Sequence, residues 1–113
     1  MTKYLISFGD GAMTFPDEDL PSVSAASHDV VREIKEAGAW VFGGGVNYNV
    51  DASVVDTDGT TTHGPYPESK ARLGGMTVIE VPSREEALEW AAKIAVACRC
   101  AQEVREFMFD PES

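Results

Sequence analysis

The chain has 113 residues and a formal net charge of −10, which is enough sequence for one domain (1–113) built around a single core. Hydrophobic residues make up 43% and charged residues 25%, as in ordinary globular proteins. So acidic a chain lacks the cationic surface that direct binding to nucleic acid or anionic lipid requires. With no apolar run of about 18 residues and no signal-peptide pattern after Lys3, we expect a cytoplasmic protein without a membrane partner.

Apolar spacing predicts strands where the period is two residues and helices where the steps are three and four. The predicted order is strand, helix, strand, hairpin, strand, helix and strand. Pro21 suits the first turn of the first helix, and Gly38 suits its end. The expected ranges are 3–8, 23–37, 39–46, the hairpin 49–56 with 60–63, then 76–81, 83 to 96–98, and 103–109.

Three short motifs predict how these elements begin and turn. The pair Asp58-Gly59 between β-branched residues predicts a two-residue type I′ hairpin turn. The pair Gly74-Gly75 is expected to open the next strand. Ser83 followed three residues later by Glu86 predicts a capping box at the second helix.

The order of elements predicts an α+β fold, in which an antiparallel sheet carries two helices on one face in a split β-α-β plan with an inserted hairpin. The strands around Trp40–Phe42 and Val78-Ile79 are apolar at both alternating positions. The second face of the sheet therefore also needs a cover. We expect a second copy of the chain to supply it, in a homodimer.

Cys98 and Cys100 are the two cysteines of the chain, and their spacing is poor for a mutual disulfide. Reduced thiols are the simplest interpretation. A metal site that combines them with His28 and His63 is conceivable, but it lacks a C-x-x-C spacing. We expect no metal and no cofactor.

Over nearly its whole length the chain resembles the YCII-related family, in particular its DGPF-motif branch, and the run from 63 to 92 is the specific part. That branch has an Asp-Gly-Pro-Phe run, then an acid and a lysine, two glycines, a strand with a Pro-rich exit, and an Ala-Leu-Glu-Trp-Ala-Ala helix. The corresponding positions here are His63-Gly64-Pro65-Tyr66, Glu68-Ser69-Lys70, Leu73-Gly74-Gly75, Val81-Pro82-Ser83 and Ala87-Leu88-Glu89-Trp90-Ala91-Ala92. His63 stands where the branch has Asp, and Tyr66 where it has Phe.

The resemblance implies a dimeric α+β barrel, in which two ferredoxin-like subunits pack sheet on sheet. Some relatives place a histidine on the first helix and an aspartate near its end as an acid–base dyad, and one such class dehydrochlorinates a chlorinated hydroquinone. Counted back from Gly38, the dyad's Asp position is Glu36 and its His position is Ser27, with His28 one step late. For many members no activity is assigned.

His63 is the first candidate for chemistry, because histidine exchanges protons near neutral pH and a Gly-Pro corner holds this one rigidly. The alternative is a strand-end histidine that caps a turn. His28 is the second candidate, although a regular helix points it toward the polar side while Ser27 faces the core. A solvated surface histidine is the alternative there. Tyr66, Lys70, Trp40 and Ser27 are the expected ligand-binding residues.

Two functions of different classes remain open. In the first, a homodimeric protein binds an unknown small molecule and performs proton-transfer or lyase-like chemistry, with His63 as acid or base, Tyr66 as donor and Lys70 as electrostatic anchor. In the second, the protein is a non-catalytic ligand-binding or accessory module. The resemblance supports the second through DGPF-type proteins that occur next to, or fused to, extracytoplasmic-function sigma factors.

Overall fold

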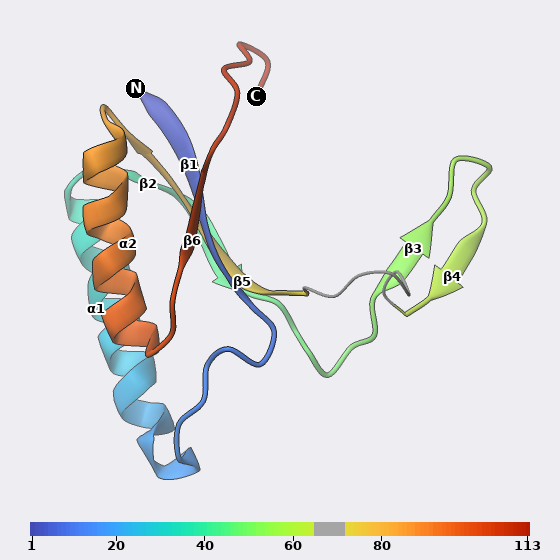
Figure 1. Cartoon of the computed structure of the whole chain (residues 1–113), viewed down its shortest axis with the longest axis horizontal. Helices are drawn as coiled ribbons and strands as arrows, with labels where there is room; N and C mark the ends of the chain where they lie inside the picture. The colour runs from blue at the N-terminus through green and yellow to red at the C-terminus, as the bar shows by residue number, and fades with distance from the viewer. Residues whose placement is uncertain (65–71) are drawn as a thin grey trace.

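The computed structural model describes residues 1–64 and 72–113. The predicted order of helices and strands is confirmed, with one short 3-10 turn added before the first helix (Figure 1). The elements are β1 (Thr2–Gly9), η1 (Asp17–Asp19), α1 (Leu20–Glu36), β2 (Trp40–Gly45), β3 (Ser53–Val55), β4 (Thr61–His63), β5 (Leu73–Val81), α2 (Arg84–Cys98) and β6 (Glu103–Glu106).

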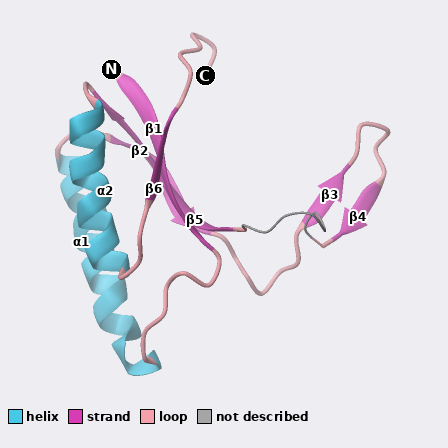
Figure 2. Ribbon diagram, in the orientation of Figure 1, coloured by secondary structure: helices cyan, strands magenta, loops and turns pink. Residues whose placement is uncertain are grey.

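Four strands form an antiparallel sheet in the order β2-β5-β1-β6, so β2 and β6 are its edges. Both helices lie side by side on one face of this sheet (Figure 1). The strands β3 and β4 form a separate two-stranded sheet that projects away from the rest (Figure 2). The α+β class predicted from the sequence is therefore confirmed.

The core lies between the sheet and the two helices. Alternate residues of the central strands point into it, with Tyr4 and Ile6 on β1 and Ile79 and Val81 on β5. All four have exposed fractions of 3% or less. The intervening residues, such as Leu5, point to the opposite side of the sheet, which we call the open face.

The ends of the helices follow local sequence rules. Pro21 lies in the first turn of α1, and Gly38 takes a φ of +74° just beyond its end. The Ser83 hydroxyl accepts a hydrogen bond from the Glu86 backbone N–H at 3.2 Å, which confirms the predicted cap of α2. Arg99 ends α2 in the left-handed region, with a φ of 57°.

The hairpin turn differs from the predicted type I′ turn. A type I′ turn needs positive φ at both central residues, but only Gly59 has it, with a φ of +87°. The Gly59 N–H donates to the Asp56 carbonyl at 2.9 Å, and the Asp56 N–H donates to the Thr60 carbonyl at 2.8 Å. The Asp58 carboxylate accepts the Thr60 N–H at 2.8 Å, so Asp58 stabilises a longer turn with Gly59 as its left-handed residue.

Two strand boundaries also differ from prediction. Gly74 and Gly75 lie inside β5, which begins at Leu73, because β1 approaches this part of the strand closely. The last strand ends at Glu106 rather than at residue 109. Beyond it, the Phe107 N–H still donates to the Lys3 carbonyl at 3.0 Å, so the chain continues alongside β1 for one more residue.

Within residues 1–64 and 72–113, neither helix has the combination of length and apolar content that crossing a bilayer requires.

Residues 46–64 include β3 and β4, and we call this segment the arm.

Candidate functional site

A cavity of about 380 Å³ lies between the helices and one end of the sheet. The glycine run 43–45 of β2 and Met76 and Thr77 of β5 form its sheet side. The helices contribute mostly apolar side chains from the opposite side, together with two polar positions and a thiol. These helix residues are Ser27, His28, Val30, Val31, Ile34, Ile94, Ala97 and Cys98.

Two aromatic side chains, Trp40 and Phe8, also line the cavity. A Cβ atom added at Gly43 would lie 2.7 Å from Cη2 of Trp40, and one added at Gly75 would lie 2.6 Å from Cζ of Phe8. Both distances are too short for a real contact, so each ring fits closely against the backbone only because glycine stands there: Trp40 over its own strand β2, and Phe8 over β5. The glycines therefore shape the aromatic part of the cavity wall.

One part of the helix wall carries polar groups. The Ser27 hydroxyl donates to the Val23 carbonyl at 2.9 Å, and its oxygen lies 3.6 Å from the Sγ atom of Cys98. Cys98 is 9% exposed. A hydroxyl, a thiol and the imidazole of His28 thus lie along one side of a cavity that is otherwise apolar.

His28 combines a position on the polar side of α1 with a place in the cavity wall. His28 is exposed, yet it lines the cavity together with Ser27 and Val31. The cavity reaches around the side of α1 on which residues 28 and 31, one turn apart, are neighbours.

His63 lies elsewhere. It is the last residue of β4, it is exposed, and its Nδ1 atom lies 3.5 Å from the Ser53 hydroxyl across the hairpin. No residue of the arm lines the cavity. Trp40, Ser27 and His28 are therefore brought together by the fold, whereas His63 is not brought to them. Tyr66 and Lys70, the other two predicted ligand-binding residues, lie outside the described residues.

Glu36, which occupies the dyad's carboxylate position by counting, is exposed and does not line the cavity. In the described part of the chain, His28 has no carboxylate partner within ion-pair distance. An acid–base dyad between His28 and Glu36 is thus not formed in this cavity.

A metal site is likewise not assembled by these residues. Within residues 1–64 and 72–113, no three His, Cys, Asp or Glu side chains lie close enough together to hold a metal ion. Cys98 and Cys100 are both free thiols.

Most of the cavity residues were not among the sequence-predicted site residues, and these include Phe8, Met13, Thr77 and Cys98. The aromatic residue Phe8 ends an alternating strand next to a Gly-Asp-Gly turn, and its register partner is Gly75. The glycines of β5 were a signal in the sequence, since glycine inside a strand often marks a close approach by another part of the chain. That Phe8 makes this approach could be recognised only once the pairing of β1 with β5 was known.

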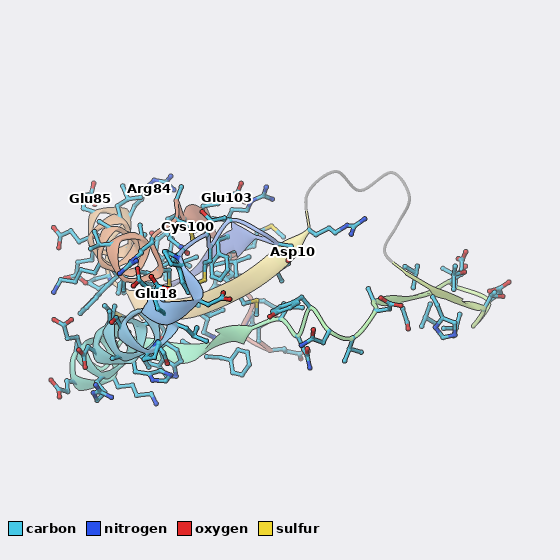
Figure 3. All side chains as sticks on the ribbon, turned by 90° about the horizontal axis from the view of Figure 1, so that it is seen from below. Asp10, Glu18, Arg84, Glu85, Cys100 and Glu103 are labelled. Atoms are coloured by element: carbon cyan, nitrogen blue, oxygen red, sulfur yellow. The ribbon has the colours of Figure 1, made fainter. Side chains whose placement is uncertain are left out.

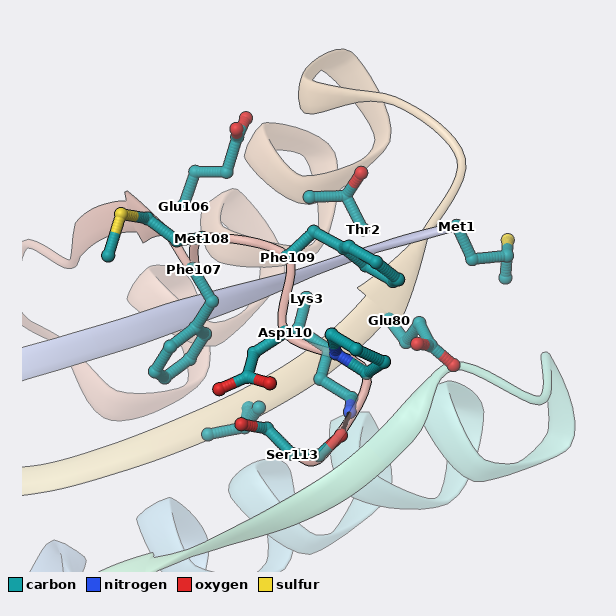
Figure 4. Close-up of a pocket in the computed structure, with 12 residues that line it drawn as sticks. Met1, Thr2, Lys3, Glu80, Glu106, Phe107, Met108, Phe109, Asp110 and Ser113 are labelled. Carbon is teal, nitrogen blue, oxygen red and sulfur yellow. Dashed lines mark hydrogen bonds between the residues drawn. The ribbon is translucent and has the colours of Figure 1, made fainter.

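A second, wider cavity of about 620 Å³ lies beneath the C-terminal segment (Figure 4). Charged residues around it include Lys3 and Glu80, and the Lys3 ammonium donates to the Ser113 oxygen at 3.2 Å. Its walls come largely from the two chain ends, and it contains no histidine or cysteine. We therefore take the smaller cavity as the candidate site.

Cys100 offers a test of the thiol environment, because burial raises its pKa and the neighbouring Cys98 thiol raises it further, against a smaller opposing effect from Gln102. Cys100, labelled in Figure 3, lies just beyond the end of α2. A raised pKa leaves less of the reactive thiolate at any given pH. Burial, the larger of the two causes, remains in a Cys98→Ala background. Alkylation of Cys100 by iodoacetamide should therefore be slow at pH 8, and its rate should rise only at a pH above the ordinary thiol range. The denatured chain is the control. A native midpoint below that of the denatured chain would contradict the prediction.

The fold and the cavity define a small α+β protein with a partly polar, mostly apolar hollow between two helices and an antiparallel sheet. The family model of the YCII-related domain matches residues 4–108, and the chain belongs to this family. No curated protein matches the chain.

Proposed function

We propose that the protein is a cytoplasmic homodimer that binds a small, largely apolar molecule in the cavity beneath α1, and that His28 transfers a proton to or from it. The observation that supports the proposal most directly is the lining of this cavity, where an imidazole, a hydroxyl and a thiol flank an apolar space. Ligand sites usually combine an apolar wall with a few polar groups of this kind.

The assignment of roles follows from where the side chains lie. His28 is at the rim, where it can exchange protons with solvent between turnovers. The Ser27 hydroxyl donates to Val23 in the helix, so toward a ligand it serves mainly as an acceptor. Trp40 and Phe8 supply flat apolar surface. Lyase-like proton abstraction beside an apolar ring or chain is the chemistry that this set fits best.

The proposal also includes three residues of the DGPF-like run: His63, Tyr66 and Lys70. They would contact the ligand only if they approach the cavity from a second subunit. We assign the chain to the DGPF branch on that run, and the subunit to a ferredoxin-like arrangement. The strand order β2-β5-β1-β6, with both helices on one face, supports that arrangement.

A non-catalytic ligand-binding or accessory module is the second candidate. The observation that favours it is the lack of a carboxylate partner for His28 among the described residues. A base without an orienting acid is weaker in catalysis. The accessory role would match an association with an extracytoplasmic-function sigma factor, for which the support is the family resemblance alone.

Two observations support the homodimer: the large solvent-exposed area of the chain and the apolar side chains on the open face of the sheet. The chain exposes 8110 Å², whereas a compact monomer of this mass exposes about 6,100 Å². Phe42 of β2, 60% exposed, is the register partner of Val78 next to Leu5, so apolar side chains cross the open face from strand to strand. A second copy packed sheet on sheet would cover them, as in a dimeric α+β barrel.

A Leu5→Glu variant should convert the dimer to a monomer, because it places a charge at the centre of the proposed interface. Sedimentation equilibrium at micromolar concentration should give twice the chain mass for the wild type and the chain mass for the variant. The control is Val96→Glu, at an 81% exposed position of α2, which should remain dimeric. A monomeric wild type would rule out the barrel.

Whether a ligand occupies the cavity is tested by filling it. Gly45 lines the cavity, and a Cβ atom added there meets no atom within 4 Å. A larger side chain at this position should therefore remove ligand binding without unfolding the protein.

A further inference from the structure

The arm, residues 46–64, makes no backbone ladder with the four-stranded sheet and forms its own two-stranded sheet instead. It extends from the end of the sheet into solvent, at the right of Figure 1. Of its residues, only Val54 and Gly64 are other than exposed. The radius of gyration of 15.7 Å exceeds the value of about 13 Å for a compact chain of this length.

A hairpin of this size is not stable by itself. Its two strands pair over three residue positions each, and isolated two-stranded hairpins are at best marginal in water. The arm also exposes apolar side chains, among them Tyr48, Val50 and Val55. It therefore needs a surface to pack against, and the described part of its own chain does not provide one.

The edge strand β2 offers such a surface. Its outer edge has no strand partner among the described residues, and Val41 is 45% exposed beside Phe42. Gly44 and Gly45 add no side chains, so the backbone N–H and C=O groups there are accessible. Unpaired edge strands readily accept another strand.

The charges on the two surfaces are complementary. The arm contains Asp51, Asp56 and Asp58 and no lysine or arginine. Next to β2, one side of α1 carries His28, Arg32 and Lys35 at steps of four and three residues. The Lys35 ammonium lies 5.5 Å from the centre of the Trp40 ring of β2, so this basic side of α1 adjoins the β2 edge.

The charge on this side of α1 is not purely positive, since Arg32 pairs with Asp29. Both groups of that pair are largely exposed, so their interaction is weak and easily exchanged. Two copies of a chain with a net charge of −10 repel each other overall. The basic residues on this side of the partner would offset part of that repulsion for an acidic arm.

We propose that each arm docks onto a second copy of the chain, along the outer edge of that copy's β2 and the adjoining His28–Arg32–Lys35 side of its α1. The inference rests on the homodimer of the proposed function. In addition to the sheet-on-sheet contact, the arm of each subunit then contacts the other subunit. The cavity mouth of each subunit then lies beside the arm of its partner, because the β2 glycines and His28 belong to both surfaces.

The test is a cross-link that can form only between two different chains. One variant carries Val55→Cys in the arm, and the other carries Val41→Cys on β2, both in a Cys98→Ala, Cys100→Ala background. The two are mixed, allowed to exchange subunits and mildly oxidised. We expect a covalent heterodimer on a non-reducing gel. The matched control pairs Val55→Cys with Val96→Cys on the outer side of α2, and should give little product.

A second measurement separates this proposal from the sheet-face dimer. A chain in which residues 50–62 are replaced by Gly-Gly should still dimerise through the open face, but its dimer dissociation constant should rise roughly tenfold or more, as expected when anchoring contacts are lost. An unchanged dissociation constant, or equal cross-linking in the test and control pairs while sedimentation shows dimers, would overturn the docked arm and leave the sheet-face dimer standing. A wild type that is monomeric would overturn both.

Discussion

A Gly45→Leu variant should fold like the wild type and lose binding of small apolar ligands. Gly45 is the register partner of Gly75 on the helix side of the sheet, and it lines the cavity. A Cβ atom at this position meets nothing within 4 Å, so a leucine extends into empty space and fills it. The loss should be large, because the leucine side chain would occupy the part of the cavity, about 380 Å³ in all, that lies between the β2 glycines and the helices.

The measurement uses para-fluorophenol as the probe and follows its fluorine NMR signal. The control is Val96→Leu, at an 81% exposed position of α2 that does not line the cavity. That variant should bind the probe like the wild type. Equal binding by both leucine variants would show that the probe occupies another site.

The same assay separates the two histidines. His28→Ala should weaken binding of the phenol, since the imidazole lines the cavity. His63→Ala should leave binding unchanged if the arm is free, and should weaken it if the arm of a second subunit reaches the cavity mouth. Loss of binding in His63→Ala alone would move the site to the arm.

The second large effect concerns stability. Gly74→Ala should lower the free energy of unfolding by about 1–3 kcal/mol, the usual cost of forcing atoms into a packed site. The added Cβ would lie 2.7 Å from the Gly9 carbonyl oxygen and 3.0 Å from the Asp10 nitrogen. These are backbone atoms, which cannot rotate away as a side chain can, and Asp10 is held by its hydrogen bond to the Arg72 carbonyl at 2.7 Å.

Urea denaturation at one fixed protein concentration measures this effect, because dimerisation makes stability concentration-dependent. Gly44→Ala is the control: it is also a glycine in a strand, but its added methyl group has open space. Its stability should stay within about 0.5 kcal/mol of the wild type. A Gly74→Ala variant as stable as this control would show that β1 and β5 do not approach each other so closely in solution.

Local sequence rules were sufficient for most of the backbone. Alternation in β1, the Pro21 start and Gly38 end of α1, and the Ser83 cap of α2 each depend on neighbours within a few residues, and each was predicted correctly. The hairpin turn was not, because Asp58 holds the Thr60 N–H with its side chain, which competes with the turn type that Asp-Gly pairs otherwise favour.

The candidate site was predicted only in part. Ser27, Trp40 and His28 were named from the sequence and do lie together around one cavity. The emphasis on His63 came from its place in the family run and from the rigidity of a Gly-Pro corner. Neither feature contains information on which strand pairs with which, and the separate pairing of β3 with β4 is what keeps His63 off the central sheet.

The class of fold, the order of its elements and the acidic character of the chain could thus be predicted from local patterns, because periodicity, capping and charge are local or additive properties. The position of the cavity depends instead on which strands pair and where the helices pack. Pairing of β1 with β5 sets Phe8 opposite Gly75, which is 67 positions later in the chain. Pairing of β2 with β5 includes a register shift between Trp40 and Phe42, and the Trp40 ring lies over Gly43. The middle of α1, which carries Ser27 and His28, lies near those rings because both helices pack on the same face of the sheet.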